Sequence, residues 1–171
     1  MVIAYAFTRP GALSPFTGRR WPVPDGRRPG AWFAEPHACG VDVLPAWIAP
    51  ELWRIELDDV LGEEHGRIFA RRGRLLERID GWDAFAAEAF ATDCCDHARA
   101  LVSGWDGDPS VREALLADAP LVANAASANV AGYFGALAAE RVAGPQAALT
   151  ERRRQASWLI AHLPPLSGPL R

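Results

Sequence analysis

The sequence predicts an α+β protein in which a small antiparallel sheet in the N-terminal half packs against a four-helix, alanine-rich lobe in the C-terminal half. Before about residue 80 the chain is rich in proline and glycine, and its apolar runs are short. After residue 80, long alanine-rich segments follow a helical period. At 171 residues, half of them hydrophobic, the chain suits a single domain with two lobes, residues 1–80 and 81–171.

Short apolar runs predict the strands of the first lobe at residues 2–7, 52–57, 67–70 and 74–79. The run 52–57 alternates apolar and polar residues, which is typical of a half-buried strand. Gly73 is expected to separate the last two strands, and Asp42 to cap a short helix that reaches Ala49.

Residues 8–30 are expected to form a long loop, because five prolines there exclude a helix and an interior strand. Loops of this length are uncommon within a compact domain and are often functional. Phe16, Trp21 and the nearby Trp32 predict that the loop packs onto the rest of the molecule.

Four helices are expected in the second lobe, over residues 82–102, 109–117, 120–142 and 146–163. Asp108-Pro109 is a typical helix start, and Gly144-Pro145 a typical helix end. The third helix is apolar nearly all round, which predicts a central position. Its small residues should let another backbone approach closely; they are Ala125, Ala128, Gly132, Gly135, Ala136 and Ala139.

Several short runs together resemble a family of uncharacterised actinobacterial and phage-associated proteins, over most of the chain. The runs that carry the resemblance are His37-Ala-Cys39, Leu44-Pro45-Ala-Trp47, Glu51-Leu52-Trp53-Arg-Ile-Glu-Leu57, Ala70-Arg-Arg-Gly73-Arg-Leu75 and the closing Glu151-Arg152…Gln155-Ala-Ser-Trp158-Leu159. Many members have a glycine before the His-Ala-Cys run, where this chain has Pro36. The family has no known activity, so the resemblance implies no reaction and no cofactor.

Asp93 and His97 are the candidate catalytic pair. A helical period over residues 82–102 places Phe85, Phe90 and Asp93 on one predicted apolar face, with His97 one turn further on. A carboxylate beside an imidazole can fix its tautomer and raise its pKa, which would give an acid–base pair with Tyr133 or Cys94 nearby. The alternative is a structural pair, since buried charges are normally paired.

Other residues are candidates for ligand binding because of their side-chain type: Trp21, Trp32, His37, Cys39, Asn124 and Asn129. A metal site built from His37, Cys39, Cys94 and His97 is not predicted, because the spacing differs from that of structural zinc sites. Nucleophilic catalysis by Cys39 or Cys94 remains open, although no activating helix N-terminus marks either cysteine.

Arginine pairs near Trp21 and Trp32, at 19–20 and 27–28, superficially suit nucleic acid. However, the net charge of −3 and the lack of a recognition motif predict no nucleic-acid partner and no attraction to anionic lipid. The uncharged stretch 119–139 is mostly alanine and glycine, which favours a buried helix over a membrane span.

The last helix is expected to bury Leu149, Ala156, Ile160 and Leu163 and to turn residues 152–154, all arginine, toward solvent. Trp158 would then project from the opposite side and meet another helix or a partner subunit, which keeps a homodimer among the candidate arrangements.

The leading hypothesis for function is a non-catalytic binding or protein-interaction module, whose partner is a small molecule or a protein. The alternatives are a small enzyme that uses Asp93 and His97, an ADP-ribosyltransferase-like protein, or a nucleic-acid-associated protein. No phosphate-loop or dinucleotide motif occurs, so the sequence leaves the cofactor unknown. Three cysteines make no disulfide framework and no signal peptide is evident, which together favour a cytoplasmic setting.

Overall fold

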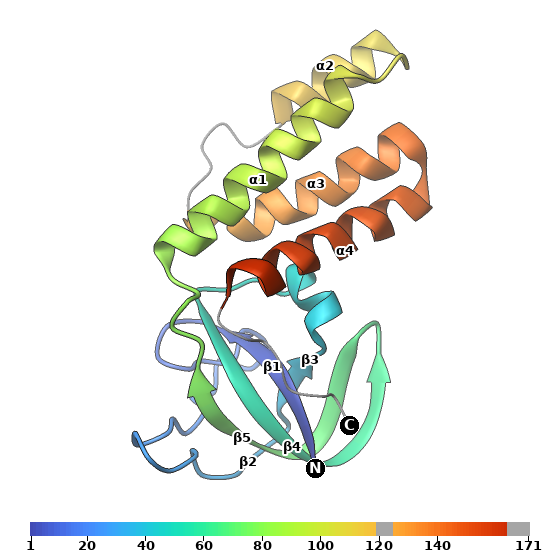
Figure 1. The fold of residues 1–171 in the computed structure, drawn as a ribbon. Coiled ribbons are helices and arrows are strands. Elements are labelled where there is room, and N and C mark those ends of the chain that lie inside the picture. The colour runs from blue at the N-terminus through green and yellow to red at the C-terminus, as the bar shows by residue number, and fades with distance from the viewer. Residues whose placement is uncertain (119–124, 164–171) are drawn as a thin grey trace.

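The computed structural model describes residues 1–118 and 125–163 and confirms the α+β class, with the sheet in the N-terminal half and the helices after it (Figure 1). The strands are β1 Val2–Thr8, β2 Phe33–Ala34, β3 His37–Cys39, β4 Glu51–Glu64 and β5 Arg67–Arg78. The helices are α1 Ala84–Ser103, α2 Pro109–Asp118, α3 Ala128–Ala143 and α4 Pro145–His162, with the short 3₁₀ segments η1 Val41–Ala46 and η2 Ala125–Ser127.

The sheet is antiparallel and curls back on itself. Its pairings β1–β4, β4–β5, β5–β3 and β3–β1 form a closed cycle, and β2 adds to β5. Successive side chains of a strand point to opposite faces. In β1, Ala4 and Ala6 therefore join a core within the sheet, whereas Tyr5 and Phe7 join the core beneath the helices.

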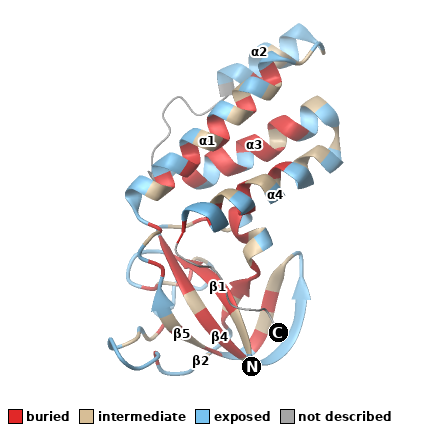
Figure 2. Ribbon diagram, viewed as in Figure 1, coloured by how far each residue is buried: buried red, intermediate tan, exposed pale blue. Residues whose placement is uncertain are grey.

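The predicted break at Gly73 does not occur, because β5 runs unbroken past it. A Cβ added at Gly73 would lie 2.7 Å from the Cβ of Pro36, so glycine is needed there for close packing rather than for a turn. The strands β4 and β5 are also longer than predicted and extend as a hairpin whose far end is exposed (Figures 1 and 2).

The predicted helix from Asp42 to Ala49 is a 3₁₀ segment, η1, that ends at Ala46. Asp42 lies in its first turn and is not the cap, because Gly40 occupies that position without a side-chain hydrogen bond.

The long loop packs onto the sheet, as predicted. Trp21 is 3% exposed and stacks on Phe33 with their ring centroids 4.7 Å apart. The buried Glu51 carboxylate holds the start of the loop, because it accepts the backbone N–H groups of Gly11 and Ala12, each at 2.9 Å. The start of the loop is thus anchored to β4 through Glu51.

The predicted apolar face of α1 is correct at Phe90, which is buried, but wrong at Phe85. Phe85, placed on that face, is 83% exposed, and the buried residues of the helix are Ala87, Phe90, Ala91, Cys94, Cys95, Ala98 and Val102. Asp93 and His97 lie at the edge of this face and are only partly buried. The cap predicted at Asp108 is confirmed, since its carboxylate accepts the Ser110 backbone N–H at 2.8 Å.

The predicted stripe of α4 is also wrong at two of its members, since Leu149 and Ile160 are 54% and 50% exposed. The helix instead buries Glu151, Gln155, Ala156 and Leu159. Trp158 meets α1 within the chain, with its ring 5.4 Å from that of Phe90.

The small residues of α3 are buried as predicted and let α1 and α4 pack closely on it (Figure 2). The start predicted at Pro120 lies outside the described residues, and α3 begins at Ala128. One core cluster joins side chains from β1, β3 and η1 to others from α1 and α4. Within the described residues, no helix combines the length and apolar character needed to cross a bilayer.

Candidate functional site

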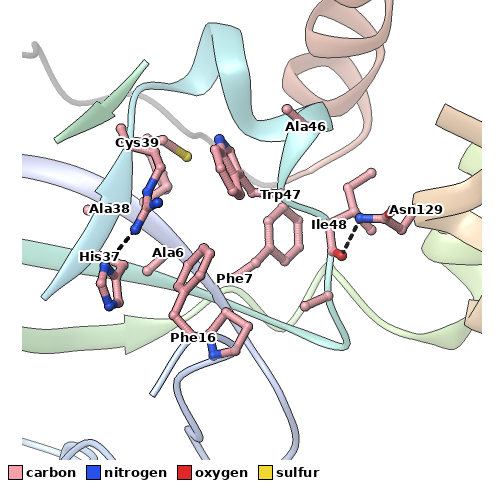
Figure 3. A pocket seen from close by; sticks show the side chains of 14 residues that line it. Ala6, Phe7, Phe16, His37, Ala38, Cys39, Ala46, Trp47, Ile48 and Asn129 are labelled. Carbon is pink, nitrogen blue, oxygen red and sulfur yellow. Dashed lines mark hydrogen bonds between the residues drawn. The ribbon is translucent and has the colours of Figure 1, made fainter. Parts of the chain in front are cut away.

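A cavity of about 280 Å³ lies where the sheet, the long loop and the segment after η1 meet (Figure 3). Its walls come from β1, β3, β5, the loop and the first turn of α3. The lining residues are Tyr5, Ala6, Phe7, Pro15, Phe16, His37, Ala38, Cys39, Ala46, Trp47, Ile48, Ala49, Arg67 and Asn129. The surface of this cavity is therefore mainly apolar, with a few polar groups among aromatic rings.

Arg67 is held at the cavity by strand pairing and by aromatic rings. Antiparallel pairing sets Cys39 of β3 opposite Arg67 of β5. The Arg67 guanidinium lies 4.3 Å from the ring centroid of Phe16 and 5.2 Å from that of Trp47. Its Nη2 atom donates to Nδ1 of His37 at 2.9 Å. The ring of Phe69 also lies 5.2 Å away, so three aromatic rings and one imidazole orient a single guanidinium.

This contact fixes the tautomer of His37. Because arginine only donates, Nδ1 of His37 accepts, and the neutral ring carries its proton on Nε2. Burial lowers the pKa of His37, and the charge of Arg67 lowers it further, against a smaller opposing effect of Glu35. The imidazole at the cavity is therefore a neutral hydrogen-bond donor at neutral pH.

Two donors at the cavity have no acceptor among the described residues. They are Nε2 of His37 and the indole Nε1 of Trp47, both buried and without a hydrogen bond. Asn129 differs, because its side-chain amide donates to the Ile48 carbonyl at 3.1 Å, as Figure 3 shows. Buried N–H groups are normally paired, so these two mark a place where a partner is missing.

The cysteines are poor candidates for a nucleophile. Burial raises the pKa of Cys39 to about 12, and it raises the pKa of Cys94 to about 12 as well. Both thiols therefore stay protonated at neutral pH. Within residues 1–118 and 125–163, no group of three or more His, Cys, Asp or Glu side chains is placed to hold a metal ion.

The residues chosen by type as ligand-binding candidates divide into three groups. His37, Cys39 and Asn129 line the cavity together. Trp21 is adjacent, with its ring 6.5 Å from that of His37, while Trp32 lies apart, beneath the guanidinium of Arg74. Asn124 lies outside the described residues.

Asp93 and His97 have partners on α4 rather than each other. The Asp93 carboxylate accepts from Arg154, and Nε2 of His97 lies 3.3 Å from Oε2 of Glu151. The predicted pairing one turn apart on α1 is therefore replaced by two contacts to a neighbouring helix. Tyr133, the third catalytic candidate, is 61% exposed on α3 and does not line the cavity of Figure 3.

Glu151 is the centre of this second cluster, and its carboxylate is fully engaged. Oε1 accepts from Arg154 at 2.9 Å and from Gln155 at 2.8 Å, while Oε2 accepts from Arg154 at 2.8 Å. Gln155 also donates to the Gly132 carbonyl at 2.9 Å. Although burial alone would lower it, the hydrogen bonds and charges of Glu151 and Asp93 raise the pKa of Arg154.

A second cavity of about 360 Å³ opens beside this cluster and is lined by His97, Glu151 and Arg154 among apolar residues of α1, α3 and α4. The carboxylate there already accepts from a guanidinium and an amide. We interpret the cluster as structural, because such a carboxylate has little capacity left to act on a substrate.

Sequence reasoning missed Arg67, Trp47 and Glu151. The signal for Arg67 was weak, because its place at the cavity depends on the pairing of β3 with β5 and on the folding back of the loop. Trp47 lay within the run shared with the resembling family, but its indole gave no sign that it would lack a partner.

Comparison with known proteins adds no assignment to this geometry: no protein-family model, no curated protein and no solved structure matches the chain.

Proposed function

We propose that this protein is a non-catalytic binding protein whose cavity between the sheet, the long loop and the segment after η1 receives a small, mainly apolar molecule. One observation carries the proposal: a mainly apolar cavity whose lining includes the guanidinium of Arg67 and two residues, His37 and Trp47, that each have a buried N–H group without an acceptor among the described residues. Ligand sites of proteins combine these two properties, an apolar surface and a few converging polar groups.

The size of the cavity supports a small ligand. At about 280 Å³ it lies just below the roughly 300–1,000 Å³ typical of sites for drug-sized molecules, which suits a smaller ligand. The buried, protonated thiols of Cys39 and Cys94 are consistent with a reducing compartment, so we place the protein in the cytoplasm as part of the same proposal.

The proposal is tested by closing the cavity. Ala46 lines the cavity and is itself exposed, so Ala46→Trp should fill the opening without disturbing the core. The matched control is Ala100→Trp, at another exposed alanine, on α1 and away from the cavity.

Thermal unfolding is measured against a panel of small aromatic and aliphatic compounds. A compound present at about a hundred times its Kd should stabilise the protein by about 2.7 kcal/mol, a shift of roughly 5–10 °C for a chain of this size. We expect the shift to disappear in Ala46→Trp and to persist in Ala100→Trp. A shift that survives in both variants would place the ligand elsewhere and refute the proposal.

A further inference from the structure

The charge of the cavity surface is one-sided. Of the lining residues only Arg67 carries a full charge at neutral pH, and no aspartate or glutamate is among them. Among the described residues, the polar contact of the Arg67 guanidinium is with the neutral His37, and no carboxylate lies within 4.0 Å of it. Elsewhere in the described chain, by contrast, arginines such as Arg74 and Arg154 are paired with acids.

The hydrogen-bonding capacity of the cavity is one-sided too. Arginine has five N–H donors, and one hydrogen bond to His37 uses only one of them. Nε2 of His37 and Nε1 of Trp47, in two further lining residues, also lack acceptors among the described residues, but both atoms are buried and do not open onto the cavity. A ligand that brings hydrogen-bond acceptors and negative charge would pair with the remaining donors of Arg67, whereas an amine would be repelled by Arg67.

We propose that the ligand is a small monocarboxylate, with its carboxylate at Arg67 and its hydrocarbon part against the rings of Phe7, Phe16 and Trp47. This inference rests on the proposed function and adds the chemical class of the ligand. A carboxylate matches the planar fork of a guanidinium, which can bind both oxygens at once.

The number of charges favours a carboxylate over a phosphate ester. A phosphate monoester carries about −1.5 to −2 at neutral pH, and the lining offers a single cation to balance it. Burying an unbalanced charge in an apolar cavity is unfavourable. The aromatic rings packed against Arg67 shield part of its guanidinium from water, which strengthens its attraction for a single anion.

The test compares benzoate with benzamide, and cyclohexanecarboxylate with its amide, since each pair differs mainly in charge. Binding is followed at low ionic strength by the ¹H–¹⁵N signal of the Trp47 indole, assigned through the Trp47→Phe variant. We expect each carboxylate to bind at least about ten times more tightly than its amide, because a hydrogen bond to a charged group contributes more than one to a neutral group. Arg67→Gln should remove this preference and leave the amide affinity unchanged.

Arg71→Gln is the matched control, because Arg71 lies on the same strand, is 69% exposed and pairs with Asp59 outside the cavity. It should leave the preference unchanged. If Arg67→Gln does not fold, Arg67→Lys serves instead: it keeps the charge but loses the fork, so the preference should shrink. An unchanged preference in either Arg67 variant would overturn the assignment of the carboxylate to Arg67.

The outcomes separate this inference from the proposed function. If the amides bind as tightly as the carboxylates and shift the Trp47 signal, the carboxylate inference fails while the binding cavity stands. If none of the four probes shifts the Trp47 signal, both proposals fail.

Discussion

The polar groups beneath α4 and those around the cavity are arranged in opposite ways. Glu151 is 3% exposed, and its two carboxylate oxygens contact Arg154, Gln155 and His97. At the cavity, Nε2 of His37 and Nε1 of Trp47 are buried without any acceptor among the described residues. Both regions bury polar atoms, but only the first provides each of these atoms with a partner from the chain itself.

The difference separates a structural role from a binding role. A satisfied buried network rigidifies the packing of the helices that share it, whereas an unsatisfied donor lowers stability until something else pairs with it. The predicted catalytic pair, Asp93 and His97, belongs to the satisfied region, and the candidate ligand residues His37 and Cys39 belong to the other.

The largest effect is expected from breaking the satisfied network. Glu151→Ala removes the bidentate partner of Arg154, which keeps only Asp93, and should lower the free energy of unfolding by about 2–4 kcal/mol, measured by urea denaturation. The control Asp96→Ala removes a 70% exposed carboxylate that pairs with Arg99 on the same helix, and should change it by less than about 1 kcal/mol. Equal effects of the two variants would contradict the structural role of Glu151.

A smaller effect should distinguish two glycines of α3. A Cβ added at Gly135 would lie 3.0 Å from Nε2 of Gln155 and 3.1 Å from Oε1 of Glu151, and both side chains are held by hydrogen bonds. Gly135→Ala should therefore destabilise the protein, by about 1–3 kcal/mol.

At Gly132 the nearest atom would lie at 3.4 Å, an ordinary contact. Gly132→Ala should be neutral or stabilising by up to about 1 kcal/mol, because alanine favours a helix. Thermal unfolding of both variants is the measurement, and a more severe loss in Gly132→Ala would mean that α4 packs differently on α3.

The smallest effects concern pH. Burial and Arg67 lower the pKa of His37 below its ordinary 6.5. Although burial opposes it, hydrogen bonds from Gly11, Ala12, Trp53 and Thr8 lower the pKa of Glu51 below its ordinary 4.5. In both cases the unfolded chain takes up the proton first, so stability is complete above the ordinary pKa and declines as the pH falls toward the folded one.

The loss of stability at acidic pH can therefore be assigned in part to His37 and in part to Glu51. His37→Gln should flatten the decline that begins below about pH 6.5, and Glu51→Gln the decline that begins below about pH 4.5. Urea denaturation at a series of pH values checks both. Should His37→Gln leave the decline below pH 6.5 unchanged, the neutral form of His37 at the cavity would be refuted.

Long periodic segments were predictable because their signal is local. The first strand, the helix at 84–103 and the cap at Asp108 follow from patterns within a few residues. The strands β2 and β3 are two and three residues long, too short for any period to show, and exist through their pairing with β5.

The inner faces of α1 and α4 were mispredicted for a physical reason. Hydrophobicity alone favours burial of Phe85 and Leu149, but the chain exposes both and buries Glu151 and Gln155. These polar residues are stable inside because Arg152 and Arg154 of the same helix, together with His97 of α1 and the Gly132 carbonyl of α3, pair with them. The last two partners are not visible in a single helix. The sequence indicated His37 and Cys39 as candidates but not Arg67. The rings of Phe16 and Trp47 beside Arg67 come from segments that are distant from it in the chain, so its position could not be read from neighbouring residues.

The polar inner face of α4 also has a consequence for the order of folding. Before α1 and α3 are in place, Glu151 lacks its contact with His97 and Gln155 lacks the Gly132 carbonyl, so burying the two side chains at that stage would leave them incompletely paired. We therefore expect α4 to dock after the folding transition state, so that substitutions at these two positions accelerate unfolding and leave the refolding rate nearly unchanged. The unfolding rate of the protein would then depend mainly on the contacts that α4 makes with α1 and α3.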